Sequence, residues 1–252
     1  MILKLLNFDF KIKVSNELPS VLVVENRQMF SRIVQSLVSG EESFALEPYV
    51  LMDDDEEILR IRDPFYFLLD PVNLPFKERV FTAGLLAQFD KALGEDEAIK
   101  KSMDEIGHDI NERLYTLGLP FHGDYSLGVE WELKKYLKTF ALGSNLEPDA
   151  TMLDNLIHFF ELYADVKHPS AIALVNCMNY FEDIDLIAIC ERAFSLKIPL
   201  LFLESSFRNV PNLKASRAII TRDFIERCTK LPAEDHLCSG DNDHSGFRAV
   251  SF

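Results

Sequence analysis

Glu25, Asn26 and Arg27 place polar side chains directly after a buried strand and at the start of a helix. In α/β proteins the carboxyl ends of strands are where ligands are commonly bound. A P-loop would require G-x-x-x-x-G-K-[ST], whose backbone amides cradle phosphates. Residues 25–32, ENRQMFSR, contain neither glycine nor lysine. We therefore expect no nucleotide as a cofactor at this junction.

Glu25 and Asp70 suggest a second kind of chemistry, the phosphorylation site of a receiver domain. Each follows a predicted strand, Asp70 within LLDPVNLP. A receiver needs a carboxylate pair to hold Mg²⁺ after the first strand, and alternating strands and helices after the phosphorylated Asp. Only Glu25 stands at the first position, and a long helical section follows Asp70. We interpret Asp70 as a turn residue before Pro71.

Other clusters of titratable residues favour structural roles. The chain contains neither G-x-S-x-G nor H-E-x-x-H, and its histidines are scattered. The acidic run DDDEE at 53–57 is typical of a solvated turn. Glu182, Asp183 and Asp185 open a predicted helix, where carboxylates complement the helix dipole. Cys228, His236, Cys238 and His244 have zinc-ligand types at irregular spacing.

The hydrophobic pattern predicts the elements that hold these residues. Strands are expected in residues 1–14, 21–24, 44–51, 57–63, 65–71, 170–176, 199–205 and 217–221. Helices are expected after residue 26 up to Gly40, within 148–166 and within 182–197. The second of these should present one apolar face, made of Met152, Leu153, Leu156, Ile157, Phe160 and Tyr163. The strand–helix–strand order from 170 to 205 predicts a right-handed crossover between parallel strands.

Residues 77–94, 96–118 and 129–143 form three further helical segments, each ending at a glycine. We expect an α/β fold with a mainly parallel sheet head, made from residues 1–73 and 147–227. An α-helical leg of residues 74–146 is inserted, and residues 228–252 form a polar, disordered tail.

The composition restricts the partners. The chain has 41 acidic and 26 basic residues, a formal net charge of −15. Such a charge repels nucleic acid at long range, so DNA binding requires local basic clusters. The four cysteines lack the spacing of a disulfide framework, and charges interrupt the apolar residues at the N-terminus. No apolar run is long enough to span a membrane. We therefore predict a cytoplasmic protein without a membrane partner.

The blocks SVLVVENRQMFSRIVQSL, SAIALVNCMNYF, IPLLFLESS and AIITRDFI resemble, in order, those of the Csn-two family, the adaptation proteins of type II-A CRISPR systems. EDEAIKKSMDEI and ELKKYLKTFALG fall where that family places its helical leg, so the resemblance spans about residues 1–226. It implies a degenerate head related to P-loop ATPases without the phosphate loop. Asn176 then stands where an ATPase carries its Mg²⁺-holding Asp, and residues 25–27 form a structural hinge, with Glu25 and Arg27 in local polar contacts.

The resemblance further implies a homotetrameric ring, without a catalytic step, that encircles the ends of linear double-stranded DNA. Its other partners would be the CRISPR integrase and the effector nuclease. The nucleic-acid-binding candidates on the inserted helices are Lys100, Lys101, Lys134, Lys135 and Lys138. Lys11, Lys13, Arg27 and Arg32 are weaker candidates. Helical ion pairs such as Glu130 with Lys134 are the competing interpretation.

Family members also bind Ca²⁺ near the junction of head and leg, and Ca²⁺ takes six to eight oxygen ligands. The matching region FHGDYSLGVEWEL holds Asp124, Glu130 and Glu132 as metal-ligand candidates. Two other functions stay open at this point. One is a degenerate P-loop-type nucleotide hydrolase, and the other is a protein-binding scaffold of the adaptation complex that does not contact DNA.

Overall fold

The computed structural model describes residues 1–40, 45–120, 132–139 and 149–229. The chain divides into two compact units. The first, called the α/β unit here, contains Met1–Leu74, Glu147–Ala164 and the chain from His168 onward. The second, the helical unit, contains Pro75–Leu146 and Asp165–Lys167. Among the described residues, no helix is both long and apolar enough to cross a membrane.

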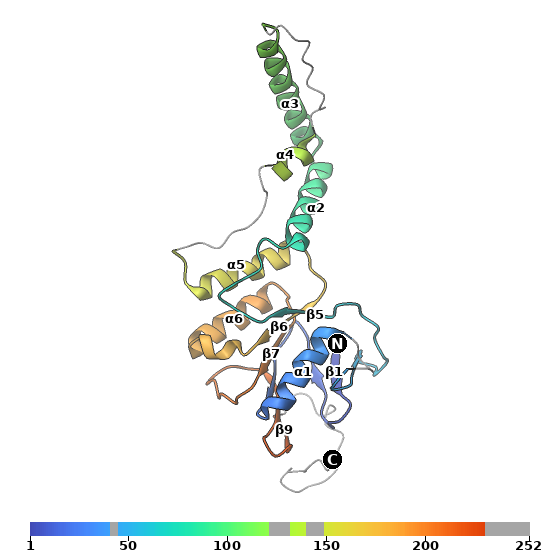
Figure 1. The fold of residues 1–252 in the computed structure, drawn as a ribbon, viewed down its shortest axis with the longest axis vertical. Helices are drawn as coiled ribbons and strands as arrows, with labels where there is room; N and C mark the ends of the chain where they lie inside the picture. The colour runs from blue at the N-terminus through green and yellow to red at the C-terminus, as the bar shows by residue number, and fades with distance from the viewer. Residues whose placement is uncertain (41–44, 121–131, 140–148, 230–252) are drawn as a thin grey trace. The chain divides into compact units, whose positions relative to one another are not determined.

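A six-stranded sheet forms the centre of the α/β unit (Figure 1). Its order is β5 (Phe65–Leu68), β6 (Ala171–Val175), β7 (Leu200–Glu204), β3 (Ser20–Val24), β8 (Ser216–Ile220) and β9 (Glu226–Thr229). The first five strands are parallel, and β9 pairs antiparallel with β8. The helix α6 (Asp183–Ser195) connects the neighbouring parallel strands β6 and β7, so the predicted crossover and the mainly parallel sheet are confirmed.

A second sheet of three strands has the order β2 (Ile12–Lys13), β1 (Ile2–Leu5) and β4 (Tyr49–Met52), all antiparallel. Strands were predicted in residues 1–14, and β1 and β2 both lie there. The predicted strand in 57–63 is wrong, since only Ile58 forms an isolated bridge, to Met52. Ile58 and Ile61 are 64% and 42% exposed, so this stretch has no apolar face to bury and no ladder to join.

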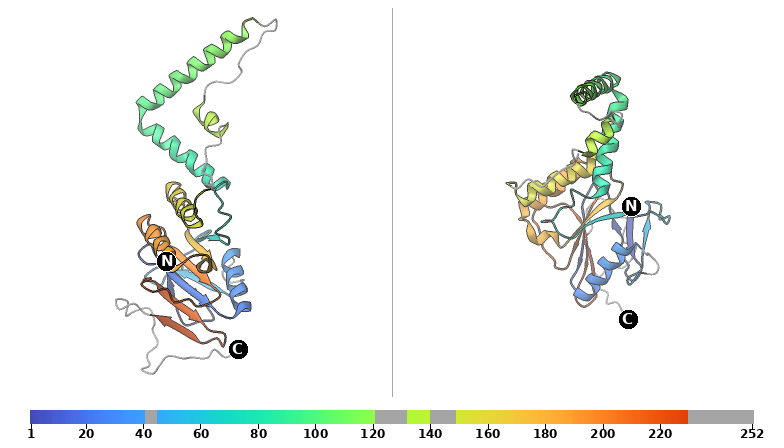
Figure 2. Two further views of the ribbon diagram at one scale, coloured as in Figure 1. Left: turned by 90° about the vertical axis from the view of Figure 1, so that its left-hand side faces the viewer. Right: turned by 45° about the horizontal axis from the view of Figure 1, so that its top comes forward.

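Helices cover both faces of the large sheet, as Figure 2 shows. The helix α1 (Arg27–Ser39) lies on one face, where Met29, Ile33 and Leu37 join a core shared with the small sheet. On the other face lie α6 and α5 (Met152–Asp165). This two-sided cover explains why β3, β6 and β7 are buried at every position.

The buried face of α5 differs in part from the predicted stripe. Leu156, Phe160 and Tyr163 are buried as expected, and Phe159 and Leu162 are buried as well. The other members of the predicted stripe, Met152, Leu153 and Ile157, are only half-buried. Phe159 and Tyr163 both pack on Tyr66 of β5, with ring centroids 6.1 and 5.7 Å away. The buried face is therefore wider than one stripe, because α5 also contacts the edge strand.

The helical unit contains α2 (Arg79–Glu95), α3 (Glu97–Gly118) and α4 (Leu133–Thr139). Gly84 of α2 approaches Val166 closely, since a β-carbon at Gly84 would lie 2.7 Å from the Val166 Cβ. The sequence placed the start of the tail at residue 228, yet β9 continues to Thr229 through pairing with β8. The remainder of the predicted tail lies outside the described residues.

Candidate nucleic-acid interface

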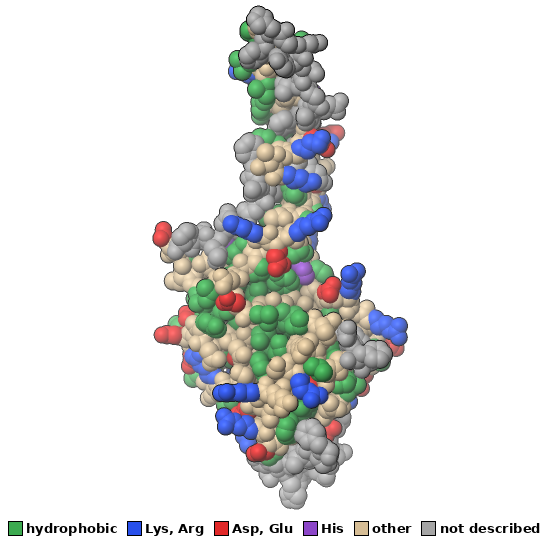
Figure 3. Space-filling view, viewed as in Figure 1, with side chains coloured by type: hydrophobic (Ala, Val, Ile, Leu, Met, Phe, Trp, Pro, Cys, Tyr) green, Lys and Arg blue, Asp and Glu red, His purple; other side chains and the backbone are tan. Residues whose placement is uncertain are grey.

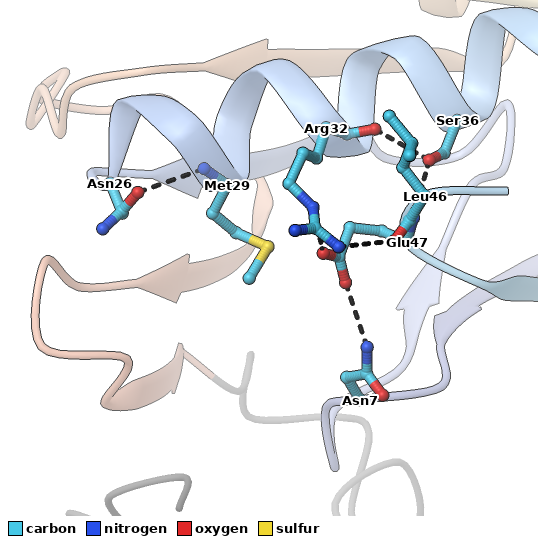
Figure 4. Close-up of polar contacts among 7 residues, drawn as sticks. All are labelled: Asn7, Asn26, Met29, Arg32, Ser36, Leu46 and Glu47. Carbon is cyan, nitrogen blue, oxygen red and sulfur yellow. Dashed lines mark hydrogen bonds and ion pairs between the residues drawn. The ribbon is translucent and has the colours of Figure 1, made fainter. Parts of the chain in front are cut away.

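The junction between β3 and α1 is a helix cap. Asn26 is the N-cap residue, and its Oδ1 accepts a hydrogen bond from the Met29 amide at 3.1 Å (Figure 4). Helix α1 ends at Gly40, whose φ of 68° favours glycine. The cap thus satisfies an amide that a P-loop would turn toward phosphate. Local polar contacts were predicted for Glu25 and Arg27, but their side chains make no hydrogen bond or ion pair with described residues. The local contact at this junction is made by Asn26 instead.

Arg32 is held by groups of the α/β unit itself. Its Nε lies 2.8 Å from an oxygen of the buried Glu47, and its Nη2 donates to the Leu46 carbonyl at 2.8 Å (Figure 4). The other Glu47 oxygen accepts from Asn7 at 3.0 Å, and the Glu47 amide donates to Ser36 Oγ at 2.8 Å. These contacts tie α1 to the small sheet, so Arg32 has a structural role.

The acidic turn at 53–57 engages two more of the weaker candidates. Lys11 pairs with Glu56, and Lys13 Nζ lies 3.4 Å from Asp54. Asp53 Oδ1 accepts the amides of Asp55 and Glu57, each at 2.9 Å, which folds the turn on itself. The turn is exposed as predicted, and the ion pairs of Lys11 and Lys13 hold it to β2 and the residue before it.

Asp70 closes a turn, as interpreted from the sequence. Its Oδ1 accepts the Val72 amide at 2.9 Å, and its Oδ2 accepts from the Asn73 side chain. These hydrogen bonds lower the pKa of Asp70, the one from Asn73 having the larger effect. A carboxylate occupied in this way is a turn residue rather than a phosphoacceptor.

Asn176 links the carboxyl ends of β6 and β7. It adopts a left-handed conformation with φ 52°, which Asn tolerates better than most residues. Its amide donates to the Leu203 carbonyl at 2.8 Å, and its Oδ1 accepts the Ser205 amide at 2.9 Å. The residue therefore stands at the end of β6, as expected, and its side-chain oxygen is engaged with the protein backbone.

Glu204, at the end of β7, is a buried carboxylate that the sequence analysis missed. It is 1% exposed, and its Oε1 accepts the Met178 amide at 3.1 Å. Burial raises its pKa to about 7, against the effects of amide hydrogen bonds and the nearby Arg208. The other residues of β7 are all apolar. A single carboxylate at the end of an apolar strand was the only sequence signal for this residue.

Arg208 joins the loop after β7 to α6. Its Nη1 donates to the Phe181 carbonyl at 2.8 Å and to that of Met178, and its Nη2 pairs with Asp183. At the start of α6, Asp185 accepts the Glu182 amide at 3.1 Å. The three acidic residues predicted at the start of this helix thus cap it and hold it to the loop.

The predicted DNA-binding lysines lie on two helices of the helical unit. Lys100 and Lys101 are exposed in the first turns of α3, and Lys135 and Lys138 are exposed on α4. Lys134 is in α4, but its side chain lies outside the described part of the structure. With 100° between successive helical residues, Lys135 and Lys138 lie about 60° apart around the axis of α4, so these two lysines are on one side of the helix.

Two of these lysines have helical partners. Lys101 Nζ lies 3.9 Å from Glu105, and Lys135 Nζ lies 2.7 Å from Glu132. Lys100 and Lys138 make no side-chain hydrogen bond or ion pair with described residues. Figure 3 shows Lys and Arg side chains recurring separately along the helical unit, with carboxylates near several of them.

The predicted metal ligands stay largely untested. Asp124 and Glu130 lie outside the described residues. Glu132 is exposed and paired with Lys135. Within the described ranges, no group of three or more His, Cys, Asp or Glu residues is arranged to hold a metal ion.

Comparison with known proteins identifies related chains. Residues 45–224 match the family model described as CRISPR-associated protein (Cas_Csn2). A solved structure entitled "Crystal structure of Stu0660 of Streptococcus thermophilus" aligns with a TM-score of 0.53 at 10% identity, covering 88% of this chain and 75% of that one. This likeness shows a common fold. No curated protein matches the sequence.

Proposed function

The chain belongs to the Csn2 family of CRISPR-associated adaptation proteins, and from this membership we propose that it supports spacer acquisition by binding the ends of linear double-stranded DNA. It binds as a ring of four subunits, without sequence preference and without a catalytic step. The ring threads over a DNA end and holds it for the CRISPR integrase and the effector nuclease.

The observation that carries the DNA-binding proposal is the charge of α4. Its seven residues, LKKYLKT, contain three lysines and no carboxylate, in a chain with a net charge of −15. A local cluster is what an acidic protein needs to bind a polyanion. Lysine contacts to phosphates do not discriminate between bases, so binding is independent of sequence and weakens with salt.

The ion pairs already made by these lysines do not oppose the proposal. Lys101–Glu105 and Lys135–Glu132 are pairs between exposed side chains close together in the chain, the first within α3 and the second between α4 and the residue before it. Such pairs contribute about 0–1 kcal/mol each, so phosphates can replace the carboxylates at small cost.

An exposed apolar stripe on α3 supports self-association. Its members recur every three or four residues and are 39–68% exposed: Ile99, Met103, Ile106, Ile110, Leu114 and Leu117. A helix with such a stripe is stabilised by packing it against another helix. A second copy of the chain offers the same stripe, and several copies are needed because one subunit has too few lysines to surround a duplex.

The cap at the start of α1 supports a function without nucleotide. The Asn26 side chain engages an amide of the first helical turn, and residues 25–32 supply no glycine for close approach of a pyrophosphate. A Ca²⁺ site that includes Asp124, Glu130 and Glu132 is also part of the proposal.

The test is a competition for the protein, at fixed salt, between a relaxed, covalently closed plasmid and the same plasmid cut once. A closed ring can load only over an end, so we expect the cut form to be bound and the closed form to be left free. A singly nicked circle has a strand break but no duplex end, so it controls for binding to the break itself. Equal affinity for all three forms would contradict threading, and no binding to any of them would favour a scaffold that contacts only proteins.

A further inference from the structure

A second basic region follows β7, in the α/β unit. Residues 209–229 contain four basic and two acidic residues, a net charge of +2, while all other residues together carry −17. The basic residues are Lys214, Arg217, Arg222 and Arg227, and the acidic ones are Asp223 and Glu226. This reversal of sign coincides with the hairpin formed by β8 and β9.

The register of the hairpin places two arginines on one face. Arg217 is opposite Thr229, and Arg227 is opposite Ile219. Residues directly opposite each other, and residues two apart on a strand, share a face, so Arg217 and Arg227 are diagonal neighbours, about 7–8 Å apart. The alternate residues Ala218 and Ile220 point into the core and are 4% and 0% exposed. The arginine face is therefore the one turned away from that core.

The acidic residue of β9 lies on the opposite face. Glu226 precedes Arg227, so its side chain points the other way, and both of its carboxylate oxygens accept the Asp9 amide at 3.2 Å. Partial burial raises the pKa of Glu226, against the effect of this amide. The Glu226 carboxylate is therefore turned toward the turn between β1 and β2, on the face opposite to Arg217 and Arg227.

A backbone carbonyl holds the Arg217 side chain in place. The Arg217 Nη2 donates to the Leu213 carbonyl at 3.0 Å, which uses one of the five N–H donors of the guanidinium. The neighbouring Lys214 is exposed, as are Arg222 in the turn and Arg227 on the edge strand. Arg217 is thus held in place, and the other three basic residues of this region are exposed.

We propose that the face of the β8–β9 hairpin that carries Arg217 and Arg227, together with the exposed Lys214 before β8 and Arg222 in the turn, is a second binding surface for the phosphates of duplex DNA. The inference rests on the proposed function and assigns part of the DNA contact to the α/β unit, whereas the lysine candidates are on the helical unit. Arginine binds phosphate oxygens through paired N–H donors, so these interactions fix the duplex in one orientation.

Charged residues on an edge strand also prevent pairing with other sheets, a role that either sign fulfils. Charge reversal therefore separates the two roles. In the Lys214→Glu, Arg222→Glu, Arg227→Glu variant, the edge stays charged while the phosphate-binding groups are removed. Arg217 is left unchanged because it is half-buried and bonded to the backbone.

The matched control is Arg60→Glu, Arg62→Glu, Lys197→Glu. It changes the net charge equally at three exposed residues of the same unit. Affinity for a short linear duplex is measured by fluorescence anisotropy over a range of salt. We expect the hairpin variant to bind at least about tenfold more weakly than the control, with a salt slope smaller by about 2–3, at roughly 0.9 for each phosphate that is no longer neutralised. Thermal unfolding near the wild-type midpoint establishes that both variants are folded.

Arg227→Lys and Arg227→Glu provide a second comparison with a smaller change. Lys keeps the charge but loses the paired N–H donors, so we expect Arg227→Lys to weaken binding, and Arg227→Glu to weaken it further. Hairpin variants that bind like the control, while wild type binds linear duplex, would overturn this inference and leave the proposed function standing. Wild-type protein that does not bind linear duplex would overturn both.

Discussion

Glu204 shows how one buried residue couples this fold to pH. The carboxyl group lies at the carboxyl end of β7, 1% exposed, and accepts the amides of Met178 and Cys177. Burial raises its pKa to about 7, from an ordinary value of 4.5. The folded protein therefore binds this proton more tightly than the unfolded chain does.

The consequence is a loss of stability as the pH rises. Below pH 4.5 the group is protonated in both the folded and the unfolded state, so the free energy of unfolding does not change with pH on its account. Between pH 4.5 and 7 the unfolded chain releases the proton first, so the free energy of unfolding falls, by about 3 kcal/mol at about 1.4 kcal/mol per pKa unit. Above pH 7 the contribution is constant.

Glu204→Gln should remove this dependence, because the amide is neutral at every pH and its oxygen can still accept the Met178 amide. We expect the variant to gain stability relative to wild type as pH increases from 5 to 7, and the gain to level off above pH 7. Urea unfolding of both proteins across this range measures the difference. Glu191→Gln, an exposed position on α6, serves as the control. A constant difference between variant and wild type would show that the Glu204 pKa is not raised.

At the scale of elements, α4 concentrates the basic residues of the helical unit. Replacing Lys134, Lys135 and Lys138 together by Ala removes three cations but keeps a residue with high helix propensity at each position. We expect weaker binding to linear duplexes of every sequence. The dependence of log K on log salt should flatten by up to about 2.7, at 0.9 per phosphate. Anisotropy titrations at several salt concentrations give both quantities.

The control for this experiment is Lys77→Ala, Lys91→Ala, Arg113→Ala, with the same change of charge in the same unit. Lys91 and Arg113 pair with Glu95 and Asp109 within their helices. If both triple variants lower the affinity equally, the effect is one of net charge, and the assignment to α4 is wrong. Light scattering establishes whether each variant keeps the oligomeric state of wild type.

At the scale of the whole molecule, assembly is the property on which the proposed ring depends. The described residues bury the apolar stripe of α3 only in part, since Ile106 and Ile110 are 53% and 39% exposed. We expect a tetramer at micromolar concentration. Ile106→Lys with Ile110→Lys should shift it toward smaller species, because charged side chains on the stripe oppose helix packing.

Multi-angle light scattering measures this change. Ile184→Lys, at an apolar residue of α6 that is 72% exposed, is a control with the same substitution outside the stripe. A wild-type protein that stays monomeric at high concentration, in the presence of Ca²⁺, would contradict the ring. An unchanged tetramer in the double variant would place the interface elsewhere.

The sequence by itself determined the elements whose signals are local. The continuous apolar run of β3 followed by the 3.6-residue stripe of α1, and the strand–helix–strand order of β6, α6 and β7, predicted their structures correctly. These patterns depend on residues near one another in the chain, and the crossover rule converts them into a parallel sheet. The same blocks identified the family, and the lack of glycine and lysine in residues 25–32 argued against a phosphate loop.

Only the tertiary structure decided which charged residues are engaged within the protein. Arg32 meets Glu47, and Lys11 meets Glu56, across gaps in sequence that no local pattern links. The arginine face of β8–β9 depends on cross-strand register, and the pKa of Glu204 depends on burial by segments distant in the chain. Burial and charge pairing are set by long-range contacts, whereas periodicity reports only which face of an element is apolar.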